Sequence, residues 1–517
     1  MQRLLASVLS LSTLRVLNLL LVAAVTGWFF LAPGVTMVRE LSDDALGQPG
    51  VPEKVWRMHH DLSPRIETWA RSRVVEESGK EASLYDVPTT EWPMFTAVFY
   101  LLATEELQSA WEKGAHRDEP APVVRARGAV DAARDLIVDP SNHAWVRTHW
   151  GDDYLHRENV FFRSLLISGL TSHAKLTGDP SSIPMLRDQV ESLATALDRS
   201  ERGVLHDYPG ECYPIDVLAA VGFIRRADPV LGTDHSAFVA RAARAFEGSM
   251  ADDLGLVPYR MDLPEHAQVQ PSRGIGTSWI AVFAPDLWPD RAARWYAQYE
   301  ASFWQKKWWA EGFREFARGR NNDEWQVEVD AGPVLDGFGT SASAFGIAAA
   351  RRNGRFDHAY TLSAQLAAAS WTLPDGTALA PRAMSHAAAA PYLGESAIMY
   401  FHAVQPAAGV PIVTGGHTPG LVYFGYLVYF GVTFVVSAGV VLALRRVRRV
   451  PIAGRVPRMQ AAVWLLATLG GFFLLLGGHV VFGVAALVFA QLLPTSMGVS
   501  KTRRVITAPA ALRSEPR

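Results

Sequence analysis

Long uncharged runs at both ends of the chain constrain its fold more than any other feature. Residues 16–34 carry no charged side chain and, at 1.5 Å per helical residue, are long enough to cross the hydrocarbon of a bilayer. The run ends in three aromatic residues, and no A-x-A site follows it. These features favour an uncleaved membrane anchor over residues 1–35 rather than a cleaved signal peptide. Arg3 and Arg15 precede the run, so we expect the N-terminus in the cytoplasm.

A second apolar run covers residues 418–443, and its tyrosines gather towards its first half. The loop that follows, residues 444–458, contains six arginines and no acidic residue. Positive loops stay in the cytoplasm, so this loop is expected there. The region between the two runs is therefore expected on the outer side of a bacterial-type inner or plasma membrane.

The last apolar region, residues 459–497, is too long for one helix across a bilayer of about 30 Å. Gly477, Gly478 and His479 lie in its middle and could turn a hairpin of two short helices. A hairpin returns the basic tail, residues 498–517, to the cytoplasm, whereas one long tilted helix would leave it outside. The sequence thus predicts four spans, with three as the alternative.

The overall composition excludes one broad class of function. The formal net charge is −2, and a nucleic-acid binder needs a basic face to neutralise phosphates. Cys212 is the only cysteine, so the outer domain cannot contain an internal disulfide. A domain of this size has a core large enough to fold without one.

The outer domain, residues 40–415, reads as a series of helical hairpins. The first helix of each pair starts near residue 94, 158, 215, 276, 340 or 395, a repeat of about sixty residues. These first helices are apolar and rich in small residues, whereas their partners carry Arg and Glu on one face. An apolar helix belongs inside and an amphipathic one outside. The sixth inner helix can pair only with the helix near residues 55–75. The fold class is therefore predicted as all-α, an (α/α)6 toroid with membrane helices at both ends; an open helical solenoid is the alternative.

In such a ring, the long loops that precede the inner helices meet at one mouth, together with the positive ends of those helices. A pocket there is the default site. Four of these loops combine acidic residues with Tyr, Trp, His or glycines: residues 85–93, 148–159, 203–216 and 327–341. Carboxyl groups crowded beside apolar rings acquire separated pKa values, so that one can donate a proton while another accepts it.

The candidate site residues come from these loops. We expect catalytic roles for His206, Asp207, Glu211, Cys212, Asp152 and Asp336. We expect substrate contacts from Trp92, Trp150, Tyr154, Glu158, Tyr208, Tyr213, Asp216 and Asp330. Because no pair of His, Cys or acidic residues has diagnostic ligand spacing, no metal and no cofactor is predicted.

Structural roles compete with these assignments. Glu158 and Asp216 stand where acidic residues cap helices. His206 could be a solvent-exposed loop histidine, and Cys212 a small buried apolar residue. The glycine-rich run at 330–341 does not follow a strand, so it is not a dinucleotide-binding fingerprint.

Three segments resemble the linalool dehydratase-isomerase-like family: residues 150–178, 203–223 and 330–354. The resemblance covers about residues 90–360 and not the apolar ends. It implies an (α/α)6 toroid. It also implies an enzyme that, without a cofactor, protonates and removes a hydroxyl group from a small isoprenoid alcohol, using Cys, His, Tyr and carboxylate side chains.

The sequence departs from the pattern of that family at several positions. His206 and Asp207 stand where the family has Cys-Glu, Ile215 stands where a second cysteine precedes the helix, and Leu165 stands at the family's histidine. The resemblance therefore supports the fold and the site's location more than it supports the dehydratase reaction.

The favoured function is a membrane-anchored acid/base enzyme, a hydro-lyase or isomerase, acting on an isoprenoid or lipid alcohol. The alternatives are a hydrolase or lyase of a cell-envelope glycan, which would use paired carboxyl groups, and a non-catalytic glycan- or lipid-binding membrane component. The spans carry no Asp, Glu, Lys or Arg in their interiors, which argues against a transporter. The expected partners are a small-molecule or glycan substrate and the membrane; the sequence does not determine the oligomeric state.

Overall fold

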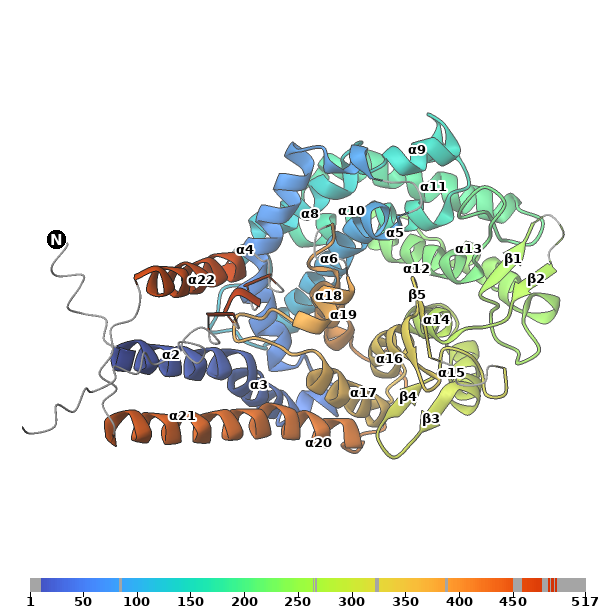
Figure 1. Cartoon of the computed structure of the whole chain (residues 1–517). Coiled ribbons are helices and arrows are strands. Elements are labelled where there is room, and N and C mark those ends of the chain that lie inside the picture. Colours follow the sequence, from blue (N-terminus) through green and yellow to red (C-terminus); the bar gives the residue numbers. More distant parts are fainter. Residues whose placement is uncertain are drawn as a thin grey trace, which may run out of the picture. The chain divides into compact units, whose positions relative to one another are not determined.

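The computed structural model describes residues 11–82, 86–263, 265, 267–320, 325–385, 389–449, 458–476, 482–483, 485–487 and 489–490. This part of the chain is mostly helical, as predicted, with a few short strands (Figure 1). The chain forms two compact units. One consists of Met1–Leu31 and Val428–Arg517, and the other of Ala32–Leu427.

Among the described residues, two helices are long and apolar enough to cross a membrane, Arg15–Leu41 and Gly420–Arg445. Both were predicted, although the first extends further along the chain than expected. Each contains a π-helical turn near the boundary between the units, at Gly27–Leu31 and at Leu427–Gly431. The first combines α2 (Leu11–Thr26) with α3 (Ala32–Leu41), and the second α20 (Gly420–Tyr426) with most of α21 (Val432–Arg449).

Within the smaller unit, α2 packs against α21. The indole N–H of Trp464, on α22 (Arg458–Leu476), donates to Oδ1 of Asn18 at 3.3 Å. The apolar part of α22, Ala462–Leu474, is shorter than a span. The predicted turn at residues 477–479, residues 450–457 of the basic loop and the tail 498–517 lie outside the described residues.

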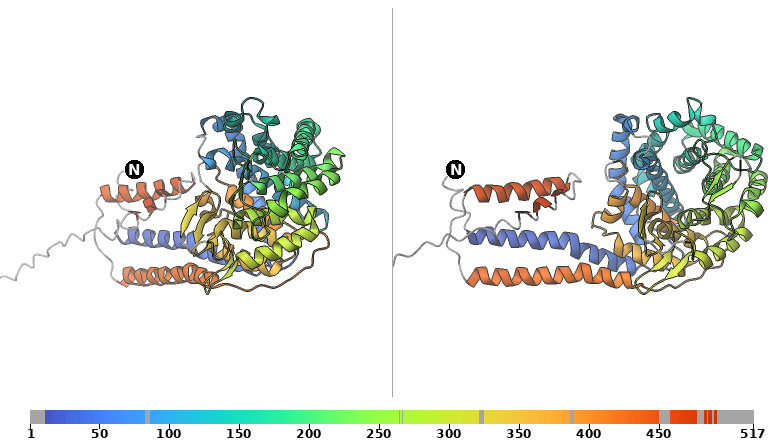
Figure 2. Two further views of the ribbon diagram at one scale, coloured as in Figure 1. Left: turned by 90° about the vertical axis from the view of Figure 1, so that its right-hand side faces the viewer. Right: turned by 45° about the vertical axis from the view of Figure 1, so that its right-hand side comes forward.

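Six largely buried helices occupy the interior of the larger unit: α6 (Trp92–Glu112), α10 (Val160–Thr177), α12 (Pro214–Leu231), α14 (Gly274–Leu287), α16 (Thr340–Arg352) and α19 (Leu393–Ala403). Each begins within two residues of its predicted start. In chain order each packs against the next, and the last, α19, packs against the first, α6. The right-hand view of Figure 2 shows the helices of this unit following one another in colour order around a common centre.

The outer helices are α4 (Glu53–Val75), α8 (Arg127–Val138), α11 (Ile183–Arg199), α13 (Ser236–Ala242), α15 (Pro289–Phe303) and α17 (Phe356–Ala369). Helix α4 packs against α8 and α19, so the first helix of the series does partner the last inner one. Helix α13 is short and continues as a 3-10 turn, Ala243–Phe246. Shorter helices occupy the connections: α5 (Val87–Thr90), α7 (Pro122–Arg125), α9 (Ala144–Trp150) and α18 (Leu379–Met384).

The strands lie in the loops before α14 and α16. A hairpin of β1 (Arg260–Asp262) and β2 (Ala267–Gln270) precedes α14. Between α15 and α16 come two antiparallel sheets, one of β3 (Trp304–Lys306) with β4 (Glu311–Phe313), and one of β5 (Gln326–Glu328), β6 (Gly332–Leu335) and β7 (Phe338–Gly339) in that order. The sequence did not predict these strands, because each is too short to show an alternating pattern.

The inner helices meet in an aromatic layer. The rings of Phe99, Trp279, Phe345 and Phe401 come from four different helices, with neighbouring centroids between 4.5 and 6.0 Å apart. Aromatic packing of this kind buries large apolar areas and fixes the helices relative to one another.

The end of the first apolar helix and the residues after it are part of the larger unit's core. Glu40 and Lys54 form a 3.3 Å ion pair, and both are 4% exposed. The guanidinium of Arg351 is buried and donates to the carbonyl groups of Ala45, Gly50 and Val404. These contacts tie residues 40–54 to the core of the larger unit.

Candidate active site

Four carboxyl groups from three different loops lie close together at the N-terminal ends of the inner helices. Glu91 directly precedes α6, and Asp216 lies in the first turn of α12. Asp207 stands in the loop before α12, and Asp330 in the turn between β5 and β6. Their charges influence one another's pKa values, which places the four groups in one site, called here the acid cluster.

Glu91 is a member of the acid cluster that holds a proton at neutral pH. Burial, followed by the neighbouring Asp330 and Asp216 carboxylates, raises the pKa of Glu91 to about 8. The Tyr208 hydroxyl donates a hydrogen bond to Oε1 of Glu91, which lowers the pKa of Glu91, but the effect of burial is larger. Glu91 therefore carries a proton at neutral pH although its side chain is only partly buried.

Asp207 lies deeper, 1% exposed. The backbone N–H of Tyr213 donates to its Oδ2 at 2.7 Å, and the backbone N–H of Phe161 also favours the charged form. Phe161 is in the first turn of α10, so Asp207 covers the positive end of that helix. Burial and the Asp216 carboxylate nonetheless raise the pKa of Asp207 well above its usual value. Its Oδ1 is buried and has no hydrogen-bond partner among the described residues.

Asp216 and Asp330 are the other two members of the acid cluster. Asp216 is partly buried, and Asp330 is exposed. Burial and the Asp330 carboxylate raise the pKa of Asp216 to about 7. The Tyr259 hydroxyl donates to Oδ2 of Asp330 at 2.6 Å, and the guanidinium of Arg273 lies 4.7 Å from the centre of the Tyr259 ring. Solvent therefore reaches the Asp330 carboxylate, and Asp216 beside it has a pKa near neutral pH.

Glu211, Cys212 and Tyr213 border the acid cluster in different ways. The Tyr213 hydroxyl donates to Glu211 at 2.8 Å, and Arg260 lies 3.7 Å from the other Glu211 oxygen. Cys212 is fully buried. Burial and the Asp207 and Asp216 carboxylates raise the pKa of its thiol, which keeps the sulfur protonated. This environment does not favour a thiolate at Cys212, so a catalytic role for it would have to use the protonated thiol.

His206 and Glu158 form a separate pair beside the acid cluster. Both the backbone N–H and Nδ1 of His206 lie 2.7 Å from Oε2 of Glu158. The neighbouring Asn159 is fully buried with a left-handed backbone, φ 34°, at the start of α10. The pair therefore fixes the loop that carries Asp207 to the start of α10.

The loop before α10 contributes less than the sequence suggested. The Asp152 side chain is fully exposed and lies 3.9 Å from Arg147. The Tyr154 hydroxyl hydrogen-bonds Nδ1 of His143 at 2.9 Å, in a buried contact below the surface. Trp150 is partly buried against the core. None of these contacts brings Asp152, Trp150 or Tyr154 to the acid cluster.

Asp336 lies apart from the acid cluster, whereas Trp92 is next to Glu91 in the chain. Asp336 accepts a hydrogen bond from Lys307 and one from Trp309 at 3.4 Å, at the end of β6 opposite Asp330. Its positive φ of 55° marks a tight turn before β7. Trp92 occupies the first position of α6, directly after Glu91, and is partly buried.

Two members of the site were not among the predicted site residues. Glu91 lies in a loop that the sequence singled out, but its neighbour Trp92 was chosen instead. Tyr259 lies in the loop before α14, one of the two loops that were not among the candidate segments. A glutamate immediately before a Trp-Pro helix start is a local signal that could have identified Glu91.

Apolar rings lie below the acid cluster. Phe161 is 6.4 Å from the Tyr208 ring and 5.4 Å from Phe95, which stacks on Phe99 at 5.3 Å. The acid cluster thus borders the aromatic layer between the inner helices.

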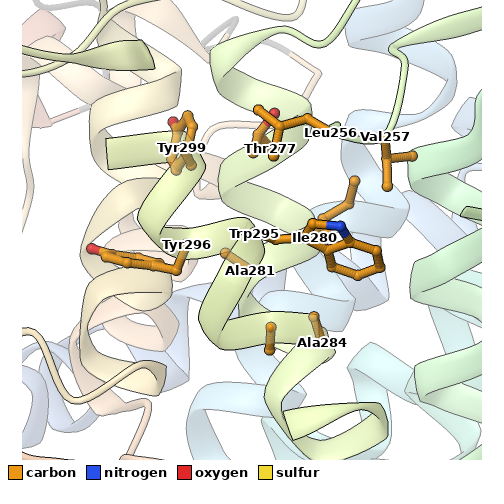
Figure 3. Close-up of a pocket in the computed structure, with 10 residues that line it drawn as sticks. Leu256, Val257, Thr277, Ile280, Ala281, Ala284, Trp295, Tyr296 and Tyr299 are labelled. Carbon is orange, nitrogen blue, oxygen red and sulfur yellow. The ribbon is translucent and has the colours of Figure 1, made fainter. Parts of the chain in front are cut away.

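A small pocket elsewhere in the larger unit is unrelated to these carboxyl groups. It lies between α14 and α15 and is lined mainly by apolar side chains, including Ile280 and Trp295 (Figure 3). Its two tyrosine hydroxyls are already used, since Tyr296 bonds Nδ1 of His358 at 3.0 Å and Tyr299 bonds Oγ of Ser278 at 2.8 Å. We interpret it as a packing gap.

Within the described ranges, no three His, Cys or acidic side chains are grouped so that they could hold a metal ion. Comparison of the sequence with protein-family models and with curated proteins finds no match.

Proposed function

We propose that this protein is a membrane-anchored, cofactor-independent acid/base enzyme whose acid cluster acts on a hydroxyl-bearing substrate. The larger unit is proposed to be an (α/α)6 toroid, supported by the cyclic order of contacts among its inner helices. The proposed topology keeps this unit outside the cytoplasm and includes four spans. The observation that carries the functional proposal is the acid cluster itself, in which Glu91, whose pKa is raised to about 8, stands near Asp216, whose pKa is raised to about 7.

In the proposed reaction, Glu91 donates its proton to the substrate hydroxyl, and the C–O bond breaks to release water. Asp216 removes a proton from the adjacent carbon, and the electron pair of that C–H bond forms the double bond. The proton then returns from Asp216 to Glu91 through the acid cluster. Burial and the neighbouring Asp330 carboxylate hold the proton affinity of Glu91 high, and the Tyr208 hydroxyl orients its side chain. This makes the favoured activity a hydro-lyase or isomerase acting on an isoprenoid or lipid alcohol, similar to the linalool dehydratase-isomerase-like family.

The apolar rings beneath the acid cluster favour an isoprenoid or lipid chain over a sugar. A glycan hydrolase or lyase is the second candidate, because the partly exposed rings of Tyr208 and Tyr213 beside carboxyl groups also suit a sugar face.

The experiment uses the full chain reconstituted in lipid vesicles, supplied with short and long isoprenoid alcohols and, separately, with cell-envelope glycan fragments. Loss of water or isomerisation of an alcohol, detected by gas chromatography, would support the first candidate. Glu91→Gln should then lower kcat by about 10²–10⁴-fold, the usual contribution of a general acid. Glu191→Gln, an exposed acid on α11, is the matched control. Release of sugar would instead support the second candidate, and unchanged turnover in Glu91→Gln would refute the acid role.

A further inference from the structure

A tryptophan at the tip of the β3–β4 hairpin is the most exposed large apolar side chain of the larger unit among the described residues. The turn of this hairpin is closed by the backbone N–H of Lys307 donating to the carbonyl of Ala310 at 2.8 Å. Between them, Trp308 is 90% exposed. A tryptophan presented in this way has no role in the core of the domain. Exposed apolar surface that is held in place commonly marks a contact with another phase or partner.

The hairpin is attached to the beginning of the second membrane helix. The backbone N–H of Leu421 donates to the carbonyl of Trp309 at 2.6 Å. At Gly420, a Cβ would lie 2.7 Å from the carbonyl oxygen of Trp308, so only glycine lets the turn approach so closely. All of these residues belong to the larger unit, so the position of the turn beside α20 is fixed within it.

The length of the second membrane helix indicates where the contact between the hairpin and α20 lies along the bilayer normal. Gly420–Arg445 contains 26 residues. At 1.5 Å per residue it is about 39 Å long, whereas the hydrocarbon is about 30 Å thick. With Arg445 at the far end, the first few residues of the helix fall in the headgroup region. Tyr423 and Phe424, at the same end, are 62% and 60% exposed. Trp and Tyr concentrate at this level of membrane proteins, where their rings are apolar and their N–H or O–H groups are hydrated.

We propose that the tip of the β3–β4 hairpin inserts Trp308 into the headgroup region of the bilayer that α20 enters. The partner is the lipid interface itself, and Trp308 and Tyr423 form an aromatic belt at the outer surface. This proposal rests on the membrane attachment in the proposed function and not on the proposed chemistry.

The insertion would also fix the distance between the acid cluster and the surface of the bilayer. Lys307 and Trp309 contact Asp336, and β6 connects Asp336 to Asp330. At about 3.3 Å per residue, these six steps span about 20 Å. The hairpin would therefore hold the carboxyl groups within reach of an alcohol whose chain extends from the outer leaflet.

The test uses labels in full-length protein reconstituted in phosphatidylcholine vesicles. Trp308→Cys receives an environment-sensitive fluorophore, and lipids with a nitroxide in the headgroup or deep in the acyl chain quench it. The native thiol, Cys212, is buried, and unsubstituted protein provides the blank. Phe434→Cys, 75% exposed in the middle of the second span, is the reference for the hydrocarbon, and Val75→Cys, 81% exposed at the end of α4, is the reference for solvent. Lys306→Cys, 66% exposed in the same hairpin, replaces Trp308→Cys if that variant does not fold.

We expect headgroup nitroxides to quench the label at 308 more strongly than acyl-chain nitroxides do, with the reverse order at 434 and little quenching by either at 75. Equal, weak quenching at 308 and 75 would overturn the insertion while leaving the span intact. Absence of quenching at 434 would overturn the membrane attachment on which the insertion rests. Neither result bears on turnover by the acid cluster, which is measured separately.

Discussion

Two glutamates, one just before inner helix α6 and one within it, have opposite electrostatic environments. Glu91 and Glu105 are fourteen positions apart, about 21 Å along α6. Burial and neighbouring carboxylates raise the pKa of Glu91 to about 8. Burial acts in the same direction on Glu105, but Arg226 and Lys175, at 2.5 and 3.0 Å, override it and lower the pKa to about 2. At the start of α6, Glu91 has other carboxyl groups as neighbours, whereas further along the helix Glu105 is paired with cations.

This difference separates groups that stabilise the fold from groups that do not. The pair between Glu105 and Arg226 joins α6 to α12 and is favourable when both partners are charged. Beside it, burial and Glu105 raise the pKa of Glu106, although Arg352 and two other cations oppose the shift. At the acid cluster, four carboxyl groups gather, and the charges that most affect the pKa values of Glu91, Asp207 and Asp216 are those of other carboxylates, whereas at Glu105 they are those of Arg226 and Lys175. Such an arrangement opposes folding at neutral pH, and proteins tolerate local cost of this kind mainly at functional sites.

Removing the cation at the paired end should have the largest effect on stability. Arg226→Met leaves Glu105 partly buried with only Lys175, so we expect the free energy of unfolding to fall by about 3 kcal/mol at pH 7. The loss should shrink at pH values below about 4, where the freed carboxylate can be protonated. Thermal unfolding in detergent measures it. Arg187→Met, which breaks an exposed 3.7 Å pair with Glu191, is the control and should cost less than about 1 kcal/mol. Equal losses in the two variants would remove the distinction between the two ends.

Replacing Glu91 with a neutral residue should change the free energy of unfolding by a smaller amount, and should increase it rather than lower it. The pKa of Glu91 is higher in the folded than in the unfolded chain, so the folded state retains a proton that the unfolded state releases. Glu91 therefore contributes a fall in the stability of the native protein as pH rises from about 4.5 to about 8, and Glu91→Gln removes this contribution. We expect the variant to match the native protein at pH 4 and to be more stable by about 1 kcal/mol at pH 8.

Infrared spectroscopy tests the same assignment directly. A protonated carboxyl band should be present at pH 7 in the native protein and weaker in Glu91→Gln. A band of unchanged intensity, or a variant less stable than the native protein at pH 8, would contradict the raised proton affinity of Glu91.

The smallest effect is expected at Asp152, which the sequence grouped with the catalytic residues and the structure leaves in solvent. Asp152→Asn should change neither the melting temperature nor the turnover of whichever substrate is identified. A loss of turnover with normal folding would show that the loop before α10 belongs to the site. The acid cluster would then not be the whole site.

The helical repeat was predictable because burial imposes a local pattern on each helix. Apolar helices rich in small residues, such as 340–352, can only lie inside, and Arg-rich partners such as 183–199 can only lie outside. The loops were harder to interpret. Asp152 and Asp207 look equivalent in sequence, yet one is fully solvated and the other is 1% exposed. Short strands such as β6 carry Asp330 to the acid cluster and have no pattern of their own.

The sequence by itself determined the apolar ends, the order and starts of the paired helices and the loops in which acid groups occur, because each depends on the local distribution of apolar and polar residues. Only the tertiary structure decided which acids meet. The interaction of Glu91 with Tyr208 joins residues 117 positions apart. Proton affinity depends on burial and on charges within a few ångströms, and both are set by the packing of distant segments.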